Sequence, residues 1–299
     1  MAFPSRIRQG IRTSEARAVR LYADARRVGR GGRSSPGPAK LAGVPRAPLE
    51  PWVRATANVQ AGYRQSVTPV ETPVAVLCSS HRPIDLANVI DSVGCQTHDD
   101  LELVFVAHGD GWDLGDTEAR LADLDARLTR VTVLSAPTET SLGACLNLAL
   151  ARTSARFVAK FDGDDRYGAE YISDSLRAHA LADAGIVGKH TYYAHLQVSD
   201  EYLLRFPGHE FEYTSTMSGG TFVIDREIVD DQRFADLSLG EDRDYIRRCH
   251  RRGISTFSGD RFNYTVVRSG ANTWTIDENQ FTNGAIRYDS NWDPAEIDC

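Results

Sequence analysis

The sequence predicts an α/β fold in which the strands form a doubly wound, parallel sheet. Apolar strand patterns alternate with amphipathic helix patterns from about residue 72 to about residue 165, and this alternation is typical of parallel sheets covered by helices. The last strand of this series ends in three carboxylates, Asp162, Asp164 and Asp165. Because ligands bind beyond the carboxyl ends of the strands in such sheets, we expect a ligand site there.

Each element of the alternating part has its own local signal. The predicted strands are the apolar runs 74–78, 101–107, 131–134 and 157–161, which lack helical spacing. Pro83 opens the first predicted helix, where its missing N–H is tolerated, and a second helix is predicted over 116–128. Ser141 is the expected N-cap of a third helix, whose apolar positions follow the i, i+3, i+4 rule. A fourth helix is expected from about Ala169.

Beyond about residue 184 the alternation breaks down. Residues 192–196, 202–206, 221–224 and 261–268 have strand patterns without long helices between them. Gly219 and Gly220 indicate a close approach of the backbone to another group. A helix is predicted to begin at Gly240-Glu241-Asp242 and to end at Gly253. Acids in a first helical turn are favoured by the helix dipole, which is a sufficient structural reason for this acid pair.

The acid cluster after the fourth strand is a candidate metal site. In an extended segment Asp162 and Asp164 point to the same side, because side chains alternate with period two. Gly163 between them leaves room for a ligand to approach the backbone. Hard oxygen ligands suit Mg²⁺ or Mn²⁺, and Mg²⁺ is usually held by one or two carboxylates together with substrate phosphates.

Two other kinds of Asp-rich segment compete with a metal site. A solvated Asp-rich turn, with Lys160 and Arg166 as counter-charges, remains open on spacing alone. An EF-hand loop that begins at Asp162 is excluded, because its sixth residue is Tyr167 rather than Gly and its twelfth is Ser173 rather than Glu.

Composition and patterning exclude several classes of protein. No apolar stretch approaches the roughly 18 residues of a membrane-spanning helix, and the N-terminus lacks the apolar core of a secretory signal. The five cysteines are odd in number and widely spread, and none forms a CxxC pair. Structural zinc and a disulfide framework are therefore not expected. We expect reduced thiols and a cytoplasmic location.

The net charge of −7 conceals two parts of opposite sign. Residues 1–70 contain twelve Arg and one Lys against three acids, a formal charge of +10, which leaves −17 for the remainder. Parts so different in charge have different roles. We expect residues 1–70 to be a basic extension and linker, residues 71–275 to be the folded domain, and residues 276–299 to be a C-terminal tail.

The basic extension is compatible with several structures and partners. Apolar residues at helical spacing within residues 1–30 fit a basic amphipathic helix, which could lie at the periphery of an anionic membrane or dock on a partner. A flexible tail and a transit peptide share this composition. Nucleic acid would also be attracted to the positive charge, but we do not expect it as a partner.

From about Pro73 to Trp274, about two thirds of the protein, the chain resembles the family 2 glycosyltransferases of the GT-A fold. The resemblance rests on the order and spacing of short motifs, which are Val74-Ala75-Val76-Leu77-Cys78 with Arg82-Pro83, Gln96-Thr97, Leu142-Gly143 with Asn147, Phe161-Asp162-Gly163-Asp164-Asp165, Gly219-Gly220-Thr221 and Gly240-Glu241-Asp242. Two further stretches, Leu204-Arg205-Phe206-Pro207 and Asp260-Arg261-Phe262-Asn263-Tyr264, look similar to a bacterial subgroup that includes spore-coat maturation glycosyltransferases. The family implies a Rossmann-like, doubly wound mixed sheet with helices on both faces, here preceded by a disordered or helical extension.

The resemblance implies roles for the acids. Asp162-Gly163-Asp164 matches the DxD motif: Asp164 would coordinate the Mg²⁺ or Mn²⁺ that bridges the donor diphosphate, and Asp162 would contact the ribose or a metal-bound water. Asp165 would help to position the sugar. Asp242 matches the catalytic base, which takes the proton from the acceptor hydroxyl as it attacks the anomeric carbon with inversion. Glu241 is the alternative base.

The resemblance also implies which residues surround the donor. The expected lining of the nucleotide-sugar pocket is Ser79, His81, Arg82, His108, Asp110, Gly143, Asn147 and Gly220, with Gly219 and Thr221 bordering the acceptor or sugar side. Family members often carry Asp-Asp at the end of the second strand, where this chain has Ala107-His108 with Asp110 two positions later. A uracil-specific contact is therefore in doubt. A His that completes the metal shell in some GT-A enzymes has no clear match, since Asn272 occupies the candidate position.

The function predicted from the resemblance is a non-processive, metal-dependent, inverting transfer of a sugar from a nucleotide-diphosphate-sugar to a hydroxyl of a glycan, lipid or protein. A processive synthase is not expected, because the Gln-x-x-Arg-Trp motif is absent. A sugar nucleotidyltransferase ranks lower, because Ser79-Ser80-His81-Arg82-Pro83 lacks the glycines of a phosphate-binding loop. The non-enzymatic alternative is a nucleotide-sugar-binding or scaffolding module, which a large separation between Asp242 and the Asp162–Asp165 cluster would favour.

Overall fold

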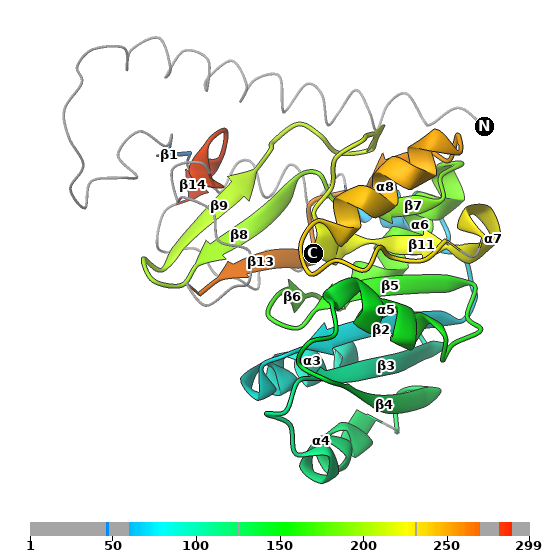
Figure 1. Cartoon of the computed structure of the whole chain (residues 1–299). Coiled ribbons are helices and arrows are strands. Elements are labelled where there is room, and N and C mark those ends of the chain that lie inside the picture. The colour runs from blue at the N-terminus through cyan, green and yellow to red at the C-terminus, as the bar shows by residue number, and fades with distance from the viewer. Residues whose placement is uncertain (1–45, 48–59, 125, 231, 270–280, 289–299) are drawn as a thin grey trace.

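The structure is a computed structural model that describes residues 46–47, 60–124, 126–230, 232–269 and 281–288. The basic helix predicted within residues 1–30 lies outside the described residues. Two mixed sheets and the helices around them form the described part of the chain (Figure 1). No helix of this part is both long and apolar enough to cross a lipid bilayer.

The main sheet has eight strands in the order β10-β12-β7-β11-β5-β2-β3-β4. In chain order these are β2 (Val74–Ser80), β3 (Leu101–His108), β4 (Arg130–Ala136), β5 (Phe157–Asp162), β7 (Ile186–Gly188), β10 (Glu212–Tyr213), β11 (Val223–Asp225) and β12 (Thr256–Ser258). β11 runs antiparallel to both of its neighbours, β5 and β7. The sheet is therefore mixed, although β2, β3, β4 and β5 form the parallel series that the alternation predicted.

The strand order reverses between β2 and β5. From β2 the chain adds β3 and then β4 on one side, and β5 then pairs with the other side of β2. In open α/β sheets the crevice for a ligand opens at such a reversal, beyond the carboxyl ends of the strands. The residues that follow β2 and β5 therefore lie where a ligand is expected.

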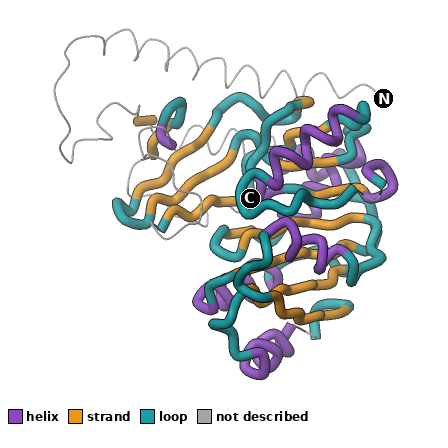
Figure 2. Tube along the Cα trace, viewed as in Figure 1, coloured by secondary structure: helices purple, strands orange, loops and turns teal. Residues whose placement is uncertain are grey.

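Helices cover both faces of the main sheet (Figure 2). Inward side chains of α3 (Leu86–Gly94), α4 (Leu114–Leu121) and α6 (Tyr171–Leu181) share one core with alternate residues of β2, such as Val76. α5 (Leu142–Leu150), α7 (Arg226–Val229) and α8 (Glu241–Arg251) share a second core with the intervening residues, such as Leu77. This alternation between two cores explains why the strands are almost continuously apolar.

Several predicted elements differ in detail from those observed. The strand predicted over 261–268 begins only at Tyr264. The helix predicted over 116–128 is shorter, because α4 ends at Leu121 and gives way to a 3₁₀ turn, Ala122–Leu124. The strand predicted over 221–224 begins later, since Gly219–Thr221 form a 3₁₀ turn and β11 follows at Val223. The last two differences replace a regular element by a 3₁₀ turn at its end, a place where such turns are common.

A second sheet of six strands has the order β1-β14-β9-β8-β13-β6. Its strands are β1 (Arg46–Ala47), β6 (Arg166–Tyr167), β8 (Tyr192–Leu196), β9 (Glu201–Arg205), β13 (Tyr264–Arg268) and β14 (Ile286–Tyr288). β6 follows the acid cluster directly, so this sheet begins beside the end of β5. β14 belongs to the segment expected to be a C-terminal tail, yet it pairs with β9.

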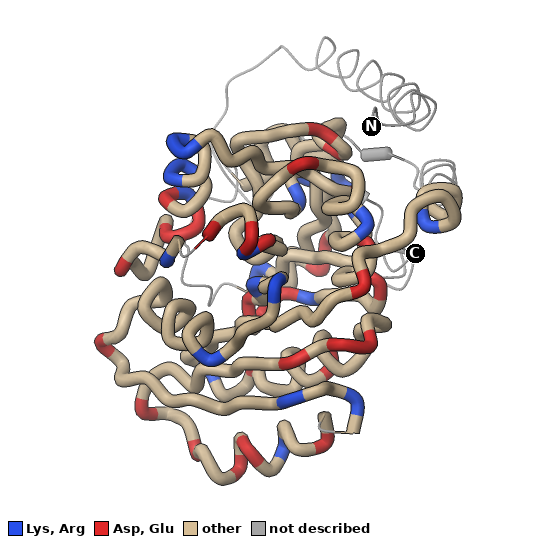
Figure 3. The backbone as a smooth tube through the Cα atoms, turned by 90° about the vertical axis from the view of Figure 1, so that its right-hand side faces the viewer, with Lys and Arg blue, Asp and Glu red and all other residues tan. Residues whose placement is uncertain are grey.

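Residues 60–66 are helical and pack on the folded domain, although the sequence placed them in the extension. Tyr63 is completely buried and its ring meets Phe211 edge-on at 5.2 Å. The amide of Gln60 donates to Asp174 Oδ2 at 3.0 Å. Charged residues of both signs are interspersed along the described chain (Figure 3), so the single-signed basic character of the extension does not continue into the fold.

We expect Tyr63→Ala to lower the free energy of unfolding by about 3 kcal/mol, because it removes a fully buried aromatic ring. Chemical denaturation of the full chain measures the change. Tyr213→Ala is the control: Tyr213 is 55% exposed, so its loss should change stability by less than about 1 kcal/mol. Equal, small effects of both substitutions would mean that the segment around Tyr63 does not stabilise the domain.

Candidate active site

The acid cluster lies at the end of β5, at the reversal of the strand order. Asp162 is the last residue of β5 and is in register with Ser79 of β2. The turn that follows is fixed by Asn88 of α3, whose amide donates to the carbonyl oxygens of Gly163 at 2.8 Å and of Asp165 at 2.7 Å. A helix side chain thus determines the path of the backbone through the cluster.

Lys160 is a buried cation beneath these acids. Its Nζ lies 2.6 Å from Asp162 Oδ1 and 3.7 Å from Glu241 Oε1. Burial would lower the pKa of Lys160, but the attraction of Asp162, Glu241 and Asp242 outweighs burial and raises it. Lys160 therefore stays charged and joins the acids after β5 to the acids that begin α8.

The pair Gly219-Gly220 lies between the two groups of acids. A Cβ built on Gly219 would lie 2.1 Å from Asp242 Oδ2, and one built on Gly220 would lie 2.8 Å from Asp162 Oδ2 and 3.1 Å from Asp165 Oδ2. Consecutive Cα atoms are about 3.8 Å apart, so one dipeptide of bare backbone separates Asp242 from the cluster after β5. Any side chain at either glycine would displace a carboxylate.

Asp165 is buried and both of its carboxylate oxygens accept hydrogen bonds. The Tyr264 hydroxyl donates to Oδ2 at 2.6 Å, and the Val267 N–H donates to Oδ1 at 3.0 Å. Burial and the nearby charges of Asp164 and Asp162 nevertheless raise the pKa of Asp165 well above its usual range. Its oxygens face β13 of the second sheet, so Asp165 connects the two sheets, whereas Asp164 beside it is half-buried.

The acids of α8 have different surroundings. Gly240 precedes the helix with φ +83°, a left-handed conformation that favours glycine. Glu241 is buried, and burial raises its pKa, with further increases from Asp242 and Asp162, while Lys160 opposes them. Asp242 is half-buried, and its Oδ1 accepts a hydrogen bond from Arg243 N–H at 2.6 Å. Asp242 is thus the more accessible of the two.

Gly143 and Asn147, expected near the donor, hold the loop that leads into α8. A Cβ on Gly143 would lie 1.8 Å from the carbonyl oxygen of Ala235, so the loop rests directly on the first turn of α5. The Asn147 amide donates to the Phe234 carbonyl at 2.9 Å and accepts from the Phe234 N–H at 2.8 Å. Both residues therefore position Glu241 and Asp242 indirectly, and direct contact with a donor stays a prediction.

The residues after β2 lie at the same edge of the sheet. His81 is exposed, and the Arg82 guanidinium binds Asp85, with its Nη2 2.5 Å from Oδ1. The Ser80 hydroxyl donates to the other oxygen of Asp85 at 2.9 Å. This turn is therefore held in one shape by Asp85, and it presents His81 to solvent.

The residues after β3 complete this edge. His108 Nε2 lies 3.3 Å from the Thr138 carbonyl oxygen, and the Thr138 hydroxyl donates to Asp110 Oδ2 at 3.3 Å. Gly109 between them has φ +90°. Ser79 and His108 thus lie at the ends of the neighbouring parallel strands β2 and β3, and His81, Arg82 and Asp110 follow these strands. Their contact with a nucleotide stays a prediction.

Several residues of the site were not predicted. Lys160 was considered only as a counter-charge in a solvated turn, yet it had a usable signal for the site, because a lysine in a buried apolar strand, two positions before Asp162, must face the same side as that acid. Asn88 and Tyr264 had no local signal, since their partners are 75 to 99 residues away in sequence. The Tyr167 hydroxyl bridges Asp162 N–H and the Gly220 carbonyl at 2.8 and 2.7 Å, and this contact also depends on tertiary structure.

The acid cluster is suited to a divalent cation. Lys160 takes one oxygen of Asp162, and Tyr264 and Val267 take both oxygens of Asp165. Asp164 and Oδ2 of Asp162 stay the predicted ligands for a cation, since two carboxylates with substrate phosphates are the usual environment of Mg²⁺. Five carboxyl groups also exceed the three described cations that interact with them, Lys160, Arg268 and Arg82, so the site retains negative charge.

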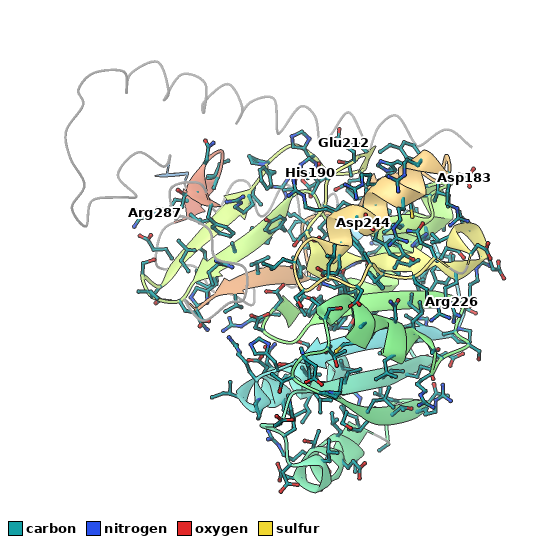
Figure 4. The ribbon with its side chains drawn as sticks, in the orientation of Figure 1. Asp183, His190, Glu212, Arg226, Asp244 and Arg287 are labelled. Atoms are coloured by element: carbon teal, nitrogen blue, oxygen red, sulfur yellow. The ribbon has the colours of Figure 1, made fainter. Side chains whose placement is uncertain are left out.

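A second group of metal-capable side chains lies elsewhere in the described chain. Ligand atoms of His190, His209 and Glu212 lie within 4.8 Å of one another. Figure 4 labels His190 and Glu212. His209 Nδ1 is 2.7 Å from Glu212 Oε1, and His190 Nδ1 is 3.1 Å from the Thr214 hydroxyl. The two imidazole rings stack with an interplanar angle of 19°, so their planes are nearly parallel. This group is a hydrogen-bonded cluster.

No protein-family model and no curated protein matches the chain, but its fold matches solved structures. The mannosyltransferase PcManGT from Pyrobaculum calidifontis, in complex with GDP-Man and Mn²⁺, superposes with a TM-score of 0.53 at 16% identity, over 73% of this chain and 68% of that chain. S. aureus TarS 1–349 superposes with a TM-score of 0.51 at 16% identity, over 65% and 60% of the two chains. The chain has the GT-A fold.

Another structure of TarS 1–349, in complex with UDP-GlcNAc, gives the same TM-score of 0.51 at 15% identity over 70% of this chain. The chain spans 60% of the length of either TarS 1–349 structure. The expected α/β class, the mixed sheet and the helices on both faces are thus confirmed. Identities this low establish the GT-A fold and no subgroup within it.

Because the pKa of Asp165 is raised by folding, its ionisation destabilises the folded state. We expect the unfolding free energy of the wild type, minus that of Asp165→Asn, to be largest below about pH 4 and to fall as pH rises toward the raised pKa. Mn²⁺ should reduce this fall by attracting the ionised cluster. Denaturation of both proteins between about pH 4 and 8 measures the difference. A difference that rises with pH would contradict the raised pKa.

Proposed function

We propose that the chain is a metal-dependent, inverting glycosyltransferase that moves one sugar from a nucleotide-diphosphate-sugar to a hydroxyl of a glycan, lipid or protein. The observation that carries this proposal is the closeness of Asp242 to Asp162 across Gly219-Gly220. This arrangement places acids that can hold a metal ion and the donor diphosphate beside an acid that can take the proton of an acceptor hydroxyl. A binding module would need the first group of acids but not the second.

On the donor side, Asp164 and Oδ2 of Asp162 would hold Mg²⁺ or Mn²⁺ together with the donor diphosphate. The ion supplies positive charge that offsets the negative charge developing on the departing nucleoside diphosphate. Lys160 fixes the orientation of Asp162 through its 2.6 Å contact with Oδ1. The nucleotide would extend over the ends of β2 and β3, past His81 and Asp110, where the strand order reverses.

On the acceptor side, Asp242 takes the proton from the attacking hydroxyl. Its carboxylate is half-buried and lies against Gly219, so an acceptor can reach it. Glu241, the alternative base, is buried and pairs with Lys160 at 3.7 Å. Because Glu241 is buried and its oxygen contacts Lys160, an acceptor hydroxyl has less access to Glu241 than to Asp242. These surroundings favour Asp242 as the base and Glu241 as the residue that positions Lys160.

The proposed reaction is a single displacement. The acceptor oxygen attacks the anomeric carbon from the side opposite the departing diphosphate while Asp242 removes its proton. For this transfer the acceptor oxygen must lie within about 3 Å of the Asp242 carboxylate, or be connected to it through one water. Transfer of one sugar at a time agrees with Arg247-Arg248-Cys249-His250 in the place of the Gln-x-x-Arg-Trp motif. Solved neighbours of the same fold carry GDP-Man and UDP-GlcNAc in their structures, so these two compounds are the first donors to test.

We expect one nucleotide-sugar of a panel that begins with GDP-Man and UDP-GlcNAc to be hydrolysed or transferred with Mn²⁺ or Mg²⁺. A chelator should abolish turnover. Asp164→Ala should abolish it as well, because Asp164 supplies a ligand that no other residue replaces. Release of nucleoside diphosphate measures turnover. Asp110→Asn is a control outside the metal site and should leave metal dependence intact.

Asp242→Asn should retain donor affinity but lower the transfer rate by about 100-fold or more, because it removes the general base. Calorimetric titration with donor and Mn²⁺ measures the affinity, and acceptor-dependent product formation measures the rate. Asp244→Asn, two residues further into α8, is the matched control and should retain transfer. If no donor of the panel binds and metal changes nothing, the acid cluster is structural and the enzyme proposal fails.

A further inference from the structure

Arg205 is a buried cation with unused hydrogen-bond donors. It is the last residue of β9 and is 4% exposed. Its guanidinium lies between two rings, 4.5 Å from the centroid of Phe206 and 4.1 Å from that of Phe281. Its Nε and Nη1 have no hydrogen-bond partner among the described residues. Buried guanidinium groups are normally paired with a carboxylate or bonded to carbonyl oxygens.

The neighbours of Arg205 do not neutralise it. Tyr192, opposite Arg205 in the register of β8 and β9, forms a hydrogen bond with the guanidinium. The two rings offer cation–π attraction, but a second cation, Arg268, repels it. Arg268 is half-buried and contacts the same Phe281 ring at 5.3 Å. The two arginines therefore form a pair whose more exposed member is Arg268.

This pair adjoins the proposed active site. Tyr192 stands 6.1 Å from Tyr264, ring to ring, and the Tyr264 hydroxyl binds Asp165. Arg268 interacts electrostatically with Asp164 and Asp165, whereas Arg205 interacts with Arg268 and Tyr192. Arg268 follows Val267, whose N–H donates to Asp165 Oδ1 at 3.0 Å, so it adjoins the acid cluster. Figure 1 shows β8, β9 and β13 beyond the end of β5, on the side away from β3 and β4.

The backbone beside Arg205 is also held in an unusual conformation. Phe206 has φ +45°, in the left-handed region that bulky residues rarely adopt. Its carbonyl oxygen accepts a hydrogen bond from the Thr191 hydroxyl at 2.6 Å. Such conformations persist where the surrounding structure enforces them, and they concentrate at ligand sites. Here the conformation holds the Phe206 ring against one face of the guanidinium.

We propose that Arg205 and Arg268 bind an anionic group, a phosphate or a carboxylate, that is carried by the sugar acceptor. The planar fork of a guanidinium matches the oxygens of both groups. The anionic group belongs to the acceptor rather than to the donor, because the nucleotide would occupy the opposite side of the acid cluster, over β2 and β3. The assignment to the acceptor rests on the proposed function, whereas the anion site itself rests on Nε and Nη1 of Arg205, which have no hydrogen-bond partner among the described residues.

The test uses the full chain and inorganic phosphate as the probe, with glucose 6-phosphate and glucuronate as sugar-borne anions. Calorimetric titration at constant ionic strength measures affinity, and glucose is the uncharged comparison. We expect the wild type to bind the anions but not glucose. Arg205→Met should bind them about tenfold or more weakly, the loss expected for a charged hydrogen bond. Arg120→Met, which removes a 43% exposed cation on α4, should bind like the wild type.

Stability distinguishes a binding role from a structural one. A buried charge that no carboxylate neutralises destabilises the folded state. Arg205→Met should therefore unfold at the same or a higher temperature than the wild type when no anion is present. Arg205→Lys retains the charge but not the planar fork, and should also bind phosphate more weakly. It serves as the second variant if Arg205→Met does not fold.

Four outcomes would overturn the proposal. The anion site is absent if the wild type binds phosphate no better than glucose, or if the Arg205 variants bind phosphate as the wild type does. A marked loss of thermal stability in Arg205→Met would make Arg205 structural. If saturating nucleoside diphosphate with Mn²⁺ displaces the phosphate, the anion belongs to the donor. Phosphate binding through Arg205 without any donor binding would retain the site and reject the proposed enzyme instead.

Discussion

The ion pairs of Lys160 are the contacts on which the proposed site depends. Asp162 and Glu241 come from segments 79 residues apart, since 241 minus 162 is 79, and their like charges would drive β5 and α8 apart. Lys160 lies between them, buried, and contacts both. An unpaired lysine in such a place would be strongly destabilising. The acids stabilise the buried Lys160, and Lys160 offsets the repulsion between the acids. These ion pairs hold the start of α8 beside the end of β5.

Close approach of the backbone at three glycines also brings the two groups of acids together. Gly219 and Gly220 place bare backbone between Asp242 and Asp162, and Gly143 lets the loop before α8 rest on α5. These glycines act by close approach, since a Cβ at each position would meet another atom at less than 3 Å. The main chain thus brings two groups of acids together from both sides of the sheet. The second sheet adds Tyr264, which orients Asp165.

The parallel part of the fold was predictable because its signals are local. Apolar runs, the N-cap at Ser141 and the acids after β5 are each visible within a few residues. The second sheet was harder, because β13 pairs with β8 and β14 with β9 across long stretches of chain. Among site residues, the candidates at strand ends follow from topology. The contact of Asp242 with Gly219, and the indirect place of Asn147, depend on tertiary packing that no local pattern encodes.

The measurement that tests the central claim most directly is the effect of Gly219→Ala on donor affinity and on transfer. The new Cβ would lie 2.1 Å from Asp242 Oδ2, so the carboxylate must move. If the two groups of acids form one active site, transfer should fall by about 100-fold, while the donor binds with Mn²⁺ as before. Gly115→Ala is the matched control, because its Cβ would meet no atom closer than 3.4 Å. Full transfer by Gly219→Ala would contradict the account.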